Sequence, residues 1–282
     1  MRFDLAALVQ NRPTEEHAVK WKNTVSRFVN LEFEDESNRQ CQQAPKALAK
    51  DEAYYLSQAH FEFENGNFQL ALRFYSKVLE FNALNIEAWT GQVRMLIELG
   101  EYREAKLWAD KAVERFPNDA ELLAAKGVAL ARNGDLAAAL VFSDAAIEER
   151  GDSAYIWLAR GDVLLARKES LADYCLDKAM QLAPKSWFVA WLAARIRFFY
   201  RKLAQALKMM ELAVEWNPGH FLVWLERGRC QESLGMLTAA EASFTQACQL
   251  NPECAAAINE LNQIHKTDLL DRALSWIGKF FK

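Results

Sequence analysis

Residues that end helices recur along this chain at a nearly constant spacing. Pro184, Pro218 and Pro252 follow one another at an interval of about 34 residues. Gly151 precedes Pro184 by one position less than this interval, and Pro117 precedes Gly151 by the full interval. Proline cannot continue a helix, and glycine readily adopts the conformations that end one. The spacing therefore predicts an array of repeated helical units, because self-similarity at such a period is typical of solenoids. The predicted units are 52–85, 86–119, 120–153, 154–186, 187–220 and 221–254.

The last unit indicates how each unit folds. Its sequence predicts two short helices that are joined by a turn containing glycine. The first helix carries Trp224 and Gly228 on one face, and the second carries Ala240, Phe244 and Ala247. Large side chains thus oppose small ones, so the two helices can approach closely and still fill the space between them. The small residue of the second helix recurs in every unit, as Ala71, Ala105, Ala139, Ala172, Ala206 and Ala240.

Several positions of this last unit match the pattern of a known repeat, namely Trp224, Gly228, Gly235, Leu237, Ala240, Phe244, Ala247 and Pro252. The unit resembles a tetratricopeptide repeat. It departs from that family's pattern at Arg227 and Gln231, where Leu and Tyr are usual. The resemblance implies an all-α fold, a right-handed superhelical α-solenoid of about six helix-turn-helix units with extra N- and C-terminal helices.

The repeat frame divides the chain into three parts, 1–50, 51–254 and 255–282. In the first part, Thr14 can cap a helix over residues 14–31 that carries an apolar stripe. This stripe predicts docking as a cap on the array, in its groove or on a second subunit. Acidic residues and glutamines follow, and they predict a mobile linker up to residue 50.

Two turns of the array lack the glycine that the others contain. They lie near residues 167–170 and 201–202, and the first of them belongs to a unit that is one residue short. We expect this middle region of the solenoid to bend differently from the rest.

The charge and the cysteines exclude some classes of function. A formal net charge of −4 and a pI near 5.7 give no basic footprint for nucleic acid. The five cysteines are scattered and have no metal-ligand spacing, which suits a reducing compartment. No apolar run is long enough to span a membrane. We therefore expect a cytoplasmic protein that meets a membrane, if at all, through its C-terminal helix.

No catalytic constellation is evident in the sequence. The four histidines are far apart in the repeat frame and have no cysteine or carboxylate partner at a useful spacing. Each glycine is isolated and is explained by a turn or by helix packing, so there is no phosphate-binding loop. We expect no enzymatic activity, no metal and no cofactor.

The resemblance implies a concave groove, lined by the first helix of each repeat, that binds a peptide or an amphipathic helix of a partner protein. Six aromatic residues make the helix over 187–200 the most informative part of that lining, either as core or as an anchor site. The groove lining has no Asn and no Lys, so it lacks the residues of the family's chaperone-binding subset. The candidate partner-binding residues are Arg94, Tyr155, Leu158, Phe188, Trp191, Arg195, Phe198, Phe199, Leu225 and Arg229.

The last fifteen residues, 268–282, predict an amphipathic helix after a capping helix. Its apolar side either packs on the array, pairs with a second subunit, or lies on a membrane surface. A side-chain charge of only +1 gives little attraction to anionic lipid. The candidate oligomer or membrane contacts are Leu270, Leu274, Trp276, Ile277, Phe280 and Phe281.

The sequence therefore predicts a protein-binding scaffold or adaptor. A self-assembling structural or membrane-peripheral scaffold that uses the terminal helices is the alternative. A chaperone for secreted proteins is a weaker alternative, which nothing in the sequence selects.

Overall fold

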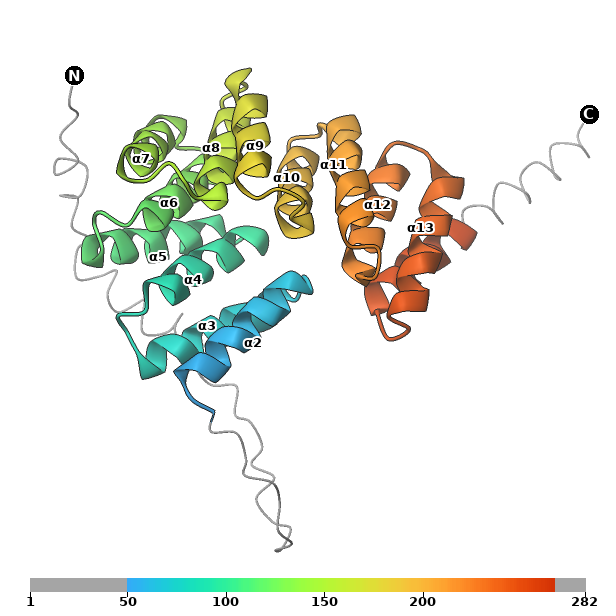
Figure 1. Ribbon diagram of the computed structural model, residues 1–282, viewed down its shortest axis with the longest axis horizontal. Coiled ribbons are helices and arrows are strands. Elements are labelled where there is room, and N and C mark those ends of the chain that lie inside the picture. The colour runs from blue at the N-terminus through green and yellow to red at the C-terminus, as the bar shows by residue number, and fades with distance from the viewer. Residues whose placement is uncertain (1–49, 267–282) are drawn as a thin grey trace, which may run out of the picture. The chain divides into compact units, whose positions relative to one another are not determined.

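The computed structural model describes residues 50–266. The predicted helix over 14–31, most of the predicted linker and the predicted helix over 268–282 lie outside them. The described residues contain twelve bounded helices and a further helical run over 255–266, with no strand among them (Figure 1). The bounds are α2 (Glu52–Glu64), α3 (Phe68–Phe81), α4 (Ile86–Glu98), α5 (Tyr102–Arg115), α6 (Ala120–Arg132), α7 (Leu136–Glu149), α8 (Ala154–Ala166), α9 (Leu171–Leu182), α10 (Trp187–Phe199), α11 (Leu203–Trp216), α12 (Phe221–Ser233) and α13 (Leu237–Leu250).

Polar side chains determine where the early first helices begin. Asp51 accepts a hydrogen bond from the backbone N–H of Tyr54 at 2.9 Å. Asn85 and Asp119 do the same at the starts of α4 and α6, at 2.8 and 2.9 Å. Each cap satisfies a backbone donor that has no partner inside the helix. Successive caps are separated by the same interval as the helix ends, so one period spaces both the starts and the ends of these helices.

Each of the six turns inside the helix pairs contains a residue with positive φ. Gly66, Gly100, Gly134 and Gly235 occupy this conformation with φ between 76° and 95°. Glycine is favoured there because it has no Cβ to clash with the backbone. In the two turns that lack glycine, the same conformation is taken by Lys168 and Arg201, each with φ of 60°. The turn geometry is therefore preserved where the sequence signal for it is absent.

Small residues allow the two helices of a pair to approach closely. A Cβ placed on Gly228 would lie 2.4 Å from the ring of Phe244, and one on Gly161 would lie 2.6 Å from Leu176. Phe244 is fully buried in the resulting space. The predicted pairing of large with small side chains is thus the way α12 packs on α13.

The expected all-α repeat solenoid is confirmed: each helix of the described chain packs against its neighbours in sequence (Figure 1).

The packing is uneven along the array. Among pairs of consecutive helices, α9 and α10 contact one another least. The junction between the pairs α8–α9 and α10–α11 is therefore the least supported connection in this part of the chain.

Candidate functional site

The first helices of the six pairs meet along one surface, which we call the inner face. Phe63 of α2 lies against Phe188 of α10, with ring centroids 5.1 Å apart. Glu98 of α4 forms an ion pair with Arg195 of the same α10. Phe63 and Phe188 belong to the first and the fifth repeats. The array therefore curves far enough for its first two repeats to contact its fifth.

The turn of the first repeat, Phe63–Phe68, covers part of α10 and α12. The Phe68 ring stacks on Trp191 at 6.3 Å between centroids. Gly66 lies against α12, since a Cβ there would be 3.1 Å from a methyl carbon of Leu222. As a result Trp191 is 0% exposed and Leu222 only 4%.

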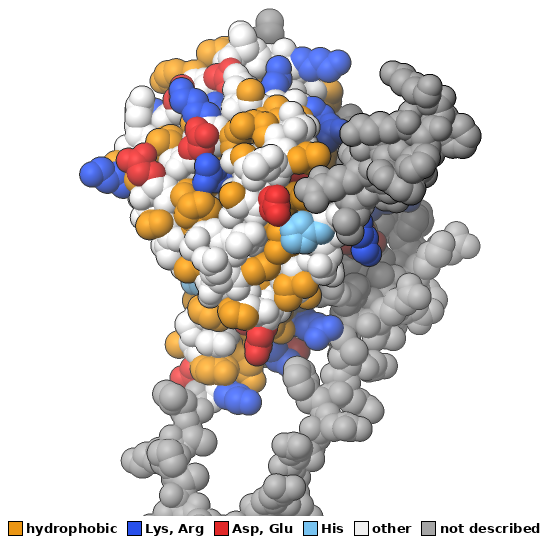
Figure 2. Space-filling view, turned by 90° about the vertical axis from the view of Figure 1, so that its right-hand side faces the viewer, with side chains coloured by type: hydrophobic (Ala, Val, Ile, Leu, Met, Phe, Trp, Pro, Cys, Tyr) orange, Lys and Arg blue, Asp and Glu red, His pale blue; other side chains and the backbone are white. Residues whose placement is uncertain are grey.

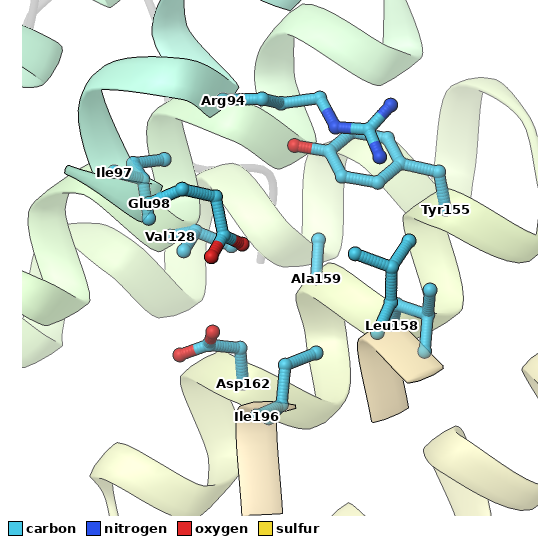
Figure 3. Close-up of a pocket in the computed structure, with 10 residues that line it drawn as sticks. Arg94, Ile97, Glu98, Val128, Tyr155, Leu158, Ala159, Asp162 and Ile196 are labelled. Carbon is cyan, nitrogen blue, oxygen red and sulfur yellow. The ribbon is translucent and has the colours of Figure 1, made fainter. Parts of the chain in front are cut away.

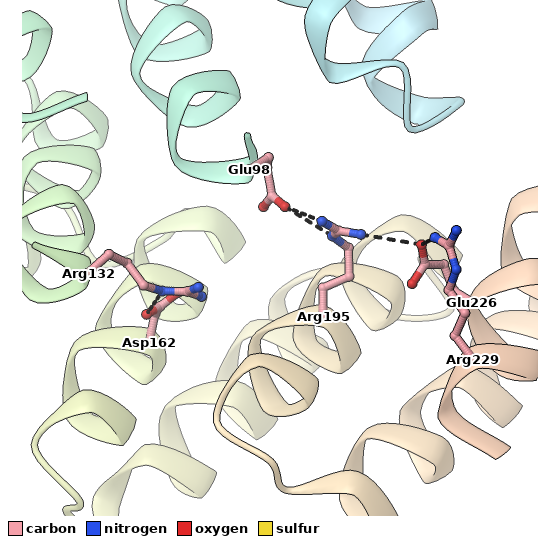
Figure 4. Close-up of polar contacts among 6 residues, drawn as sticks. All are labelled: Glu98, Arg132, Asp162, Arg195, Glu226 and Arg229. Carbon is pink, nitrogen blue, oxygen red and sulfur yellow. Dashed lines mark hydrogen bonds and ion pairs between the residues drawn. The ribbon is translucent and has the colours of Figure 1, made fainter. Parts of the chain in front are cut away.

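A chain of ion pairs crosses the inner face (Figure 4). The Arg195 guanidinium donates to the Glu98 carboxylate at 3.0 and 2.6 Å, and its third nitrogen contacts Glu226 at 3.4 Å. Arg229 donates to Glu226 and to Glu260, each at 3.0 Å. Charges from α4, α10, α12 and the helical run over 255–266 are thereby compensated within one network.

A second, more deeply buried pair lies beside this chain. Arg132 of α6 makes two hydrogen bonds, at 2.9 and 2.6 Å, to Asp162 of α8. Tyr200 donates its hydroxyl to the same carboxylate at 2.7 Å. Burial, together with the charge of Asp162, raises the pKa of Tyr200 well above its ordinary value. The Arg132 guanidinium also lies 3.4 Å from the centroid of the Phe199 ring, which is a close cation–π contact.

A small cavity of about 40 Å³ lies between α4, α6, α8 and α10. Figure 3 shows the Arg94 guanidinium against the Tyr155 ring at its edge, with Glu98 and Asp162 on another side. Arg94 lies 4.0 Å from the Tyr155 centroid and 4.8 Å from that of Phe63. This volume suits a water molecule or a methyl group rather than a side chain of a partner.

A larger cavity of about 400 Å³ opens next to it, and we call it the arginine cavity. It shares Ile97, Glu98 and Ile196 with the small cavity. Its walls combine aromatic rings with four guanidinium groups and two carboxylates. The lining residues are Ile97, Glu98, Tyr102, Arg132, Arg195, Ile196, Phe198, Phe199, Arg201, Glu226 and Arg229.

The inner face brings most of the predicted groove residues together. Arg94, Tyr155 and Leu158 line the small cavity. The residues that line the arginine cavity are Arg195, Phe198, Phe199 and Arg229.

The other three predicted groove residues line neither cavity. Two of them, Trp191 and Leu225, were predicted to contact a partner but are buried. Trp191 is fully buried, because the turn of the first repeat covers it. Leu225 is 3% exposed and belongs to the core. Phe188 is partly buried against Phe63. In this conformation Trp191 contacts the chain itself, so it offers no surface to a ligand.

The sequence prediction missed Glu98, Tyr102, Arg132 and Glu226 as parts of the site. Glu98 and Arg132 occupy the same position of the repeat frame, one repeat apart, at the last residue of a first helix. Among the predicted groove residues only Phe199 ends a first helix in the same way. Including the last residue of every first helix would have found Glu98 and Arg132, since the end of a first helix also borders the groove.

Other expectations concern the surface. Over the part of the chain that the structure describes, no three His, Cys, Asp or Glu side chains gather closely enough to hold a metal ion. Within the same residues no helix has the length and apolar character to cross a membrane. Figure 2 shows the face at the α12–α13 end of the array, where hydrophobic side chains are interspersed with charges of both signs. The predicted contacts Leu270, Leu274, Trp276, Ile277, Phe280 and Phe281 lie outside the described residues.

An array of helix pairs with a charged and aromatic inner face defines a helical-repeat protein. Residues 62–128 and 222–254 each match the tetratricopeptide repeat family. The chain is a tetratricopeptide repeat protein, as its sequence pattern predicted. Proteins of this family in general mediate contacts between proteins.

Known relatives are similar over part of their length. The chain is 24% identical over 199 residues to the BBSome complex member BBS4 of Bos taurus, covering 69% of this chain and 37% of the relative. It is 26% identical over 202 residues to the Hsp70-Hsp90 organizing protein of Triticum aestivum, covering 67% and 33%. The chain thus spans about a third of the length of these relatives.

A solved structure supports the fold. The thermophilic tetratricopeptide protein TTC0263 of Thermus thermophilus superposes with a TM-score of 0.51 at 23% identity. The match covers 65% of this chain and 98% of that one. At this identity the likeness concerns the helical architecture.

Proposed function

We propose that this protein is an adaptor that binds a short segment of a partner protein in the arginine cavity. The observation that carries the proposal is the cavity itself, about 400 Å³ on the inner face, with aromatic and guanidinium groups in its walls. Its volume falls within the range of about 300 to 1,000 Å³ that is usual for specific ligand sites. Aromatic and arginine side chains are also those that most often dominate binding energy at protein interfaces.

The cavity favours a ligand that combines an apolar side chain with a carboxylate. Phe199 is 45% exposed and offers a ring at the cavity wall. Arg201 is exposed and has no ion pair with any residue in the described part of the chain. The other three guanidinium groups of the lining are held by Asp162, Glu98, Glu226 and Glu260. Arg201 is therefore the guanidinium group of the lining that is most available to bind a carboxylate of the ligand.

Size argues for a short segment rather than a long docked helix. The turn of the first repeat already occupies the inner face beside α10 and α12. An α-helix with its side chains is about 10 to 12 Å across. The open volume suits one or two large side chains of the ligand, with the adjoining residues lying along the rim.

The test is affinity capture with a cavity variant, Phe199→Ala with Arg201→Ala. Lysate proteins bound to the immobilised full chain are quantified by mass spectrometry for the wild type and the variant. A partner that uses the cavity is expected to fall by about tenfold or more, because loss of one anchor residue commonly costs over 1 kcal/mol.

The matched control is Tyr174→Ala with Arg103→Ala, which removes an exposed ring and an exposed guanidinium outside the cavity lining. Captures should equal those of the wild type, and circular dichroism should show that all three proteins are equally helical. If the cavity variant and the control capture the same proteins in the same amounts as the wild type, the cavity is not the binding site.

The proposed setting is the cytoplasm. Cys175, Cys230, Cys248 and Cys254 are free thiols. Free thiols are typical of a reducing compartment. Localisation of the tagged full-length chain in its native cell tests this placement.

A further inference from the structure

The surface beneath the turn of the first repeat has the chemistry of a binding site. It consists of Phe188, Trp191 and Arg195 on α10 and Leu222 on α12, and we call it the covered surface. The Arg195 guanidinium lies 5.2 Å from the Trp191 centroid and 4.7 Å from that of Phe68. Phe63 meets Phe188 edge to face and Phe68 stacks on Trp191. Two aromatic side chains of the turn are thus held by two aromatic side chains and a guanidinium.

The covered surface retains one polar group without a partner. The indole nitrogen of Trp191 is buried and has no hydrogen-bond acceptor in the structure. A buried donor without an acceptor costs about 1 to 3 kcal/mol. The turn therefore fills the surface sterically but leaves its polar group unsatisfied. A ligand with an acceptor at this point would gain a hydrogen bond that the turn does not make.

Apart from Gly66, whose backbone lies against Leu222, the contact that covers this surface is made by side chains. Neither α2 nor α3 is among the helices that pack extensively on α10 or α12. The junction between α9 and α10 is also the least supported connection in the array. Because the array is closed by side-chain contacts and interrupted by a weak junction, it can open there without breaking a helix pair.

We propose that the covered surface is a second docking site, which adjoins the arginine cavity and shares only Arg195 with it, and that the Phe63–Phe68 turn is its internal ligand. The external partner is a peptide segment with two aromatic side chains and adjacent carboxylates, the chemistry of residues 61–70 (Phe-Glu-Phe-Glu-Asn-Gly-Asn-Phe-Gln-Leu). When this segment binds, its rings replace Phe63 and Phe68. Its carboxylates compete with Glu98 for Arg195, which Glu98 now holds at 2.6 Å.

The proposal is tested in the full chain with the released variant, Phe63→Ala with Phe68→Ala. The control is Phe61→Ala with Phe81→Ala, which removes two phenylalanines of the same helix pair that are 58% and 57% exposed. The probe is a fluorescent synthetic peptide of residues 61–70, and its affinity is measured by fluorescence anisotropy. The same peptide with both Phe63 and Phe68 replaced by Ala is the negative probe.

The released variant is expected to bind the probe about tenfold or more tightly than the wild type and the control, because the turn no longer competes for the surface. Hydroxyl-radical labelling of Trp191 should rise in the released variant and fall again when the probe is added. Equal binding to all three proteins, or no binding to the released variant, overturns the proposal. The proposal is also overturned if adding the probe does not lower the labelling of Trp191 in the released variant.

A milder variant covers the case in which the released variant does not fold. Glu98→Gln removes the charge that holds Arg195 and leaves the rings in place. It is expected to increase probe affinity in the same direction, and unchanged affinity overturns the proposal. The cavity variant Phe199→Ala with Arg201→Ala should leave probe binding unaltered, which separates this site from the proposed function of the arginine cavity.

Discussion

Asp162 joins separate parts of the inner face, because it accepts hydrogen bonds from Arg132 of α6 and from Tyr200 at the end of α10. Its side chain is buried and receives Arg132 and Tyr200. Replacing Asp162 by Ala leaves the Arg132 charge buried without compensation. We expect Asp162→Ala to lower the free energy of unfolding by about 3 to 5 kcal/mol. Urea unfolding followed by circular dichroism measures the change.

The matched control is the exposed ion pair of Lys77 with Glu80, whose side chains are 42% and 58% exposed. Glu80→Ala should change the free energy of unfolding by less than about 1 kcal/mol, since water already screens this pair. Equal effects of the two substitutions would show that Arg132 is solvated in solution.

Ionisation of the Cys230 thiol should make the free energy of unfolding depend on pH above pH 9. Burial, with the nearby charge of Glu226, raises its pKa from 9.0 to about 12. Below pH 9 both the folded and the unfolded chain keep the proton, so stability is unaffected. Above pH 9 the unfolded thiol ionises while the folded one does not, and stability falls as pH rises toward 12 by at most about 1.4 kcal/mol per pH unit.

Unfolding free energies measured at several pH values test this dependence. The variant Cys230→Ala removes the thiol, so its stability should fall less steeply with pH than that of the wild type above pH 9. Parallel curves for the two proteins would mean that the thiol ionises equally in both states. The comparison is needed because burial also raises the pKa of Tyr75, Tyr155 and Tyr200.

At the scale of the helix pair, replacing a turn glycine that has positive φ should measurably lower the free energy of unfolding. Gly100 has φ of 80° in the α4–α5 turn, and a Cβ added there would meet no atom within 4 Å. The cost of Gly100→Ala is therefore a backbone cost alone. We expect a loss of about 1 kcal/mol, the usual penalty for a non-glycine residue in the left-handed region. Thermal and urea unfolding measure it.

Gly219 is the control, because a Cβ there also meets nothing within 4 Å but its φ lies outside the positive region. Gly219→Ala should be neutral or stabilising by up to about 1 kcal/mol, through a smaller entropy of the unfolded chain. A loss at Gly219 as large as that at Gly100 would contradict the assignment of the cost to φ.

The elements of this fold could be predicted because their signals are local. The pairing of Phe244 with Gly228, for example, depends on residues within one repeat, and the structure places these side chains in contact. The turn conformation of Lys168 and Arg201 could not be predicted from the local sequence. They adopt the turn conformation without the residue that usually indicates it, because the helices that they join fix the geometry.

The whole array contains contacts that no repeat period encodes. Phe63 and Phe188 have different positions in their repeats, and they meet only because the curvature of all intervening repeats brings them together. Small differences in each junction accumulate along a solenoid, so its closure depends on every junction at once. For this reason the sequence predicted an aromatic surface around Trp191 but not the turn that covers it.

This closure should also determine how the whole protein unfolds. In an open solenoid each repeat is stabilised only by its neighbours, and a weak junction lets the two sides unfold separately. Here the weak α9–α10 junction is bridged by Phe63, Phe68 and the ion pair of Glu98 with Arg195. The bridge couples the helices before the junction to those after it. The wild type should therefore unfold in urea in one transition.

Removing the bridge with Phe63→Ala and Phe68→Ala should split this transition. The apparent m-value is expected to fall, because each part then exposes its own surface separately. Phe61→Ala with Phe81→Ala removes the same kind of residue from the same helix pair without touching the bridge, and it should keep a single transition. A single transition with an unchanged m-value in both variants would mean that the α9–α10 junction alone couples the two parts of the array.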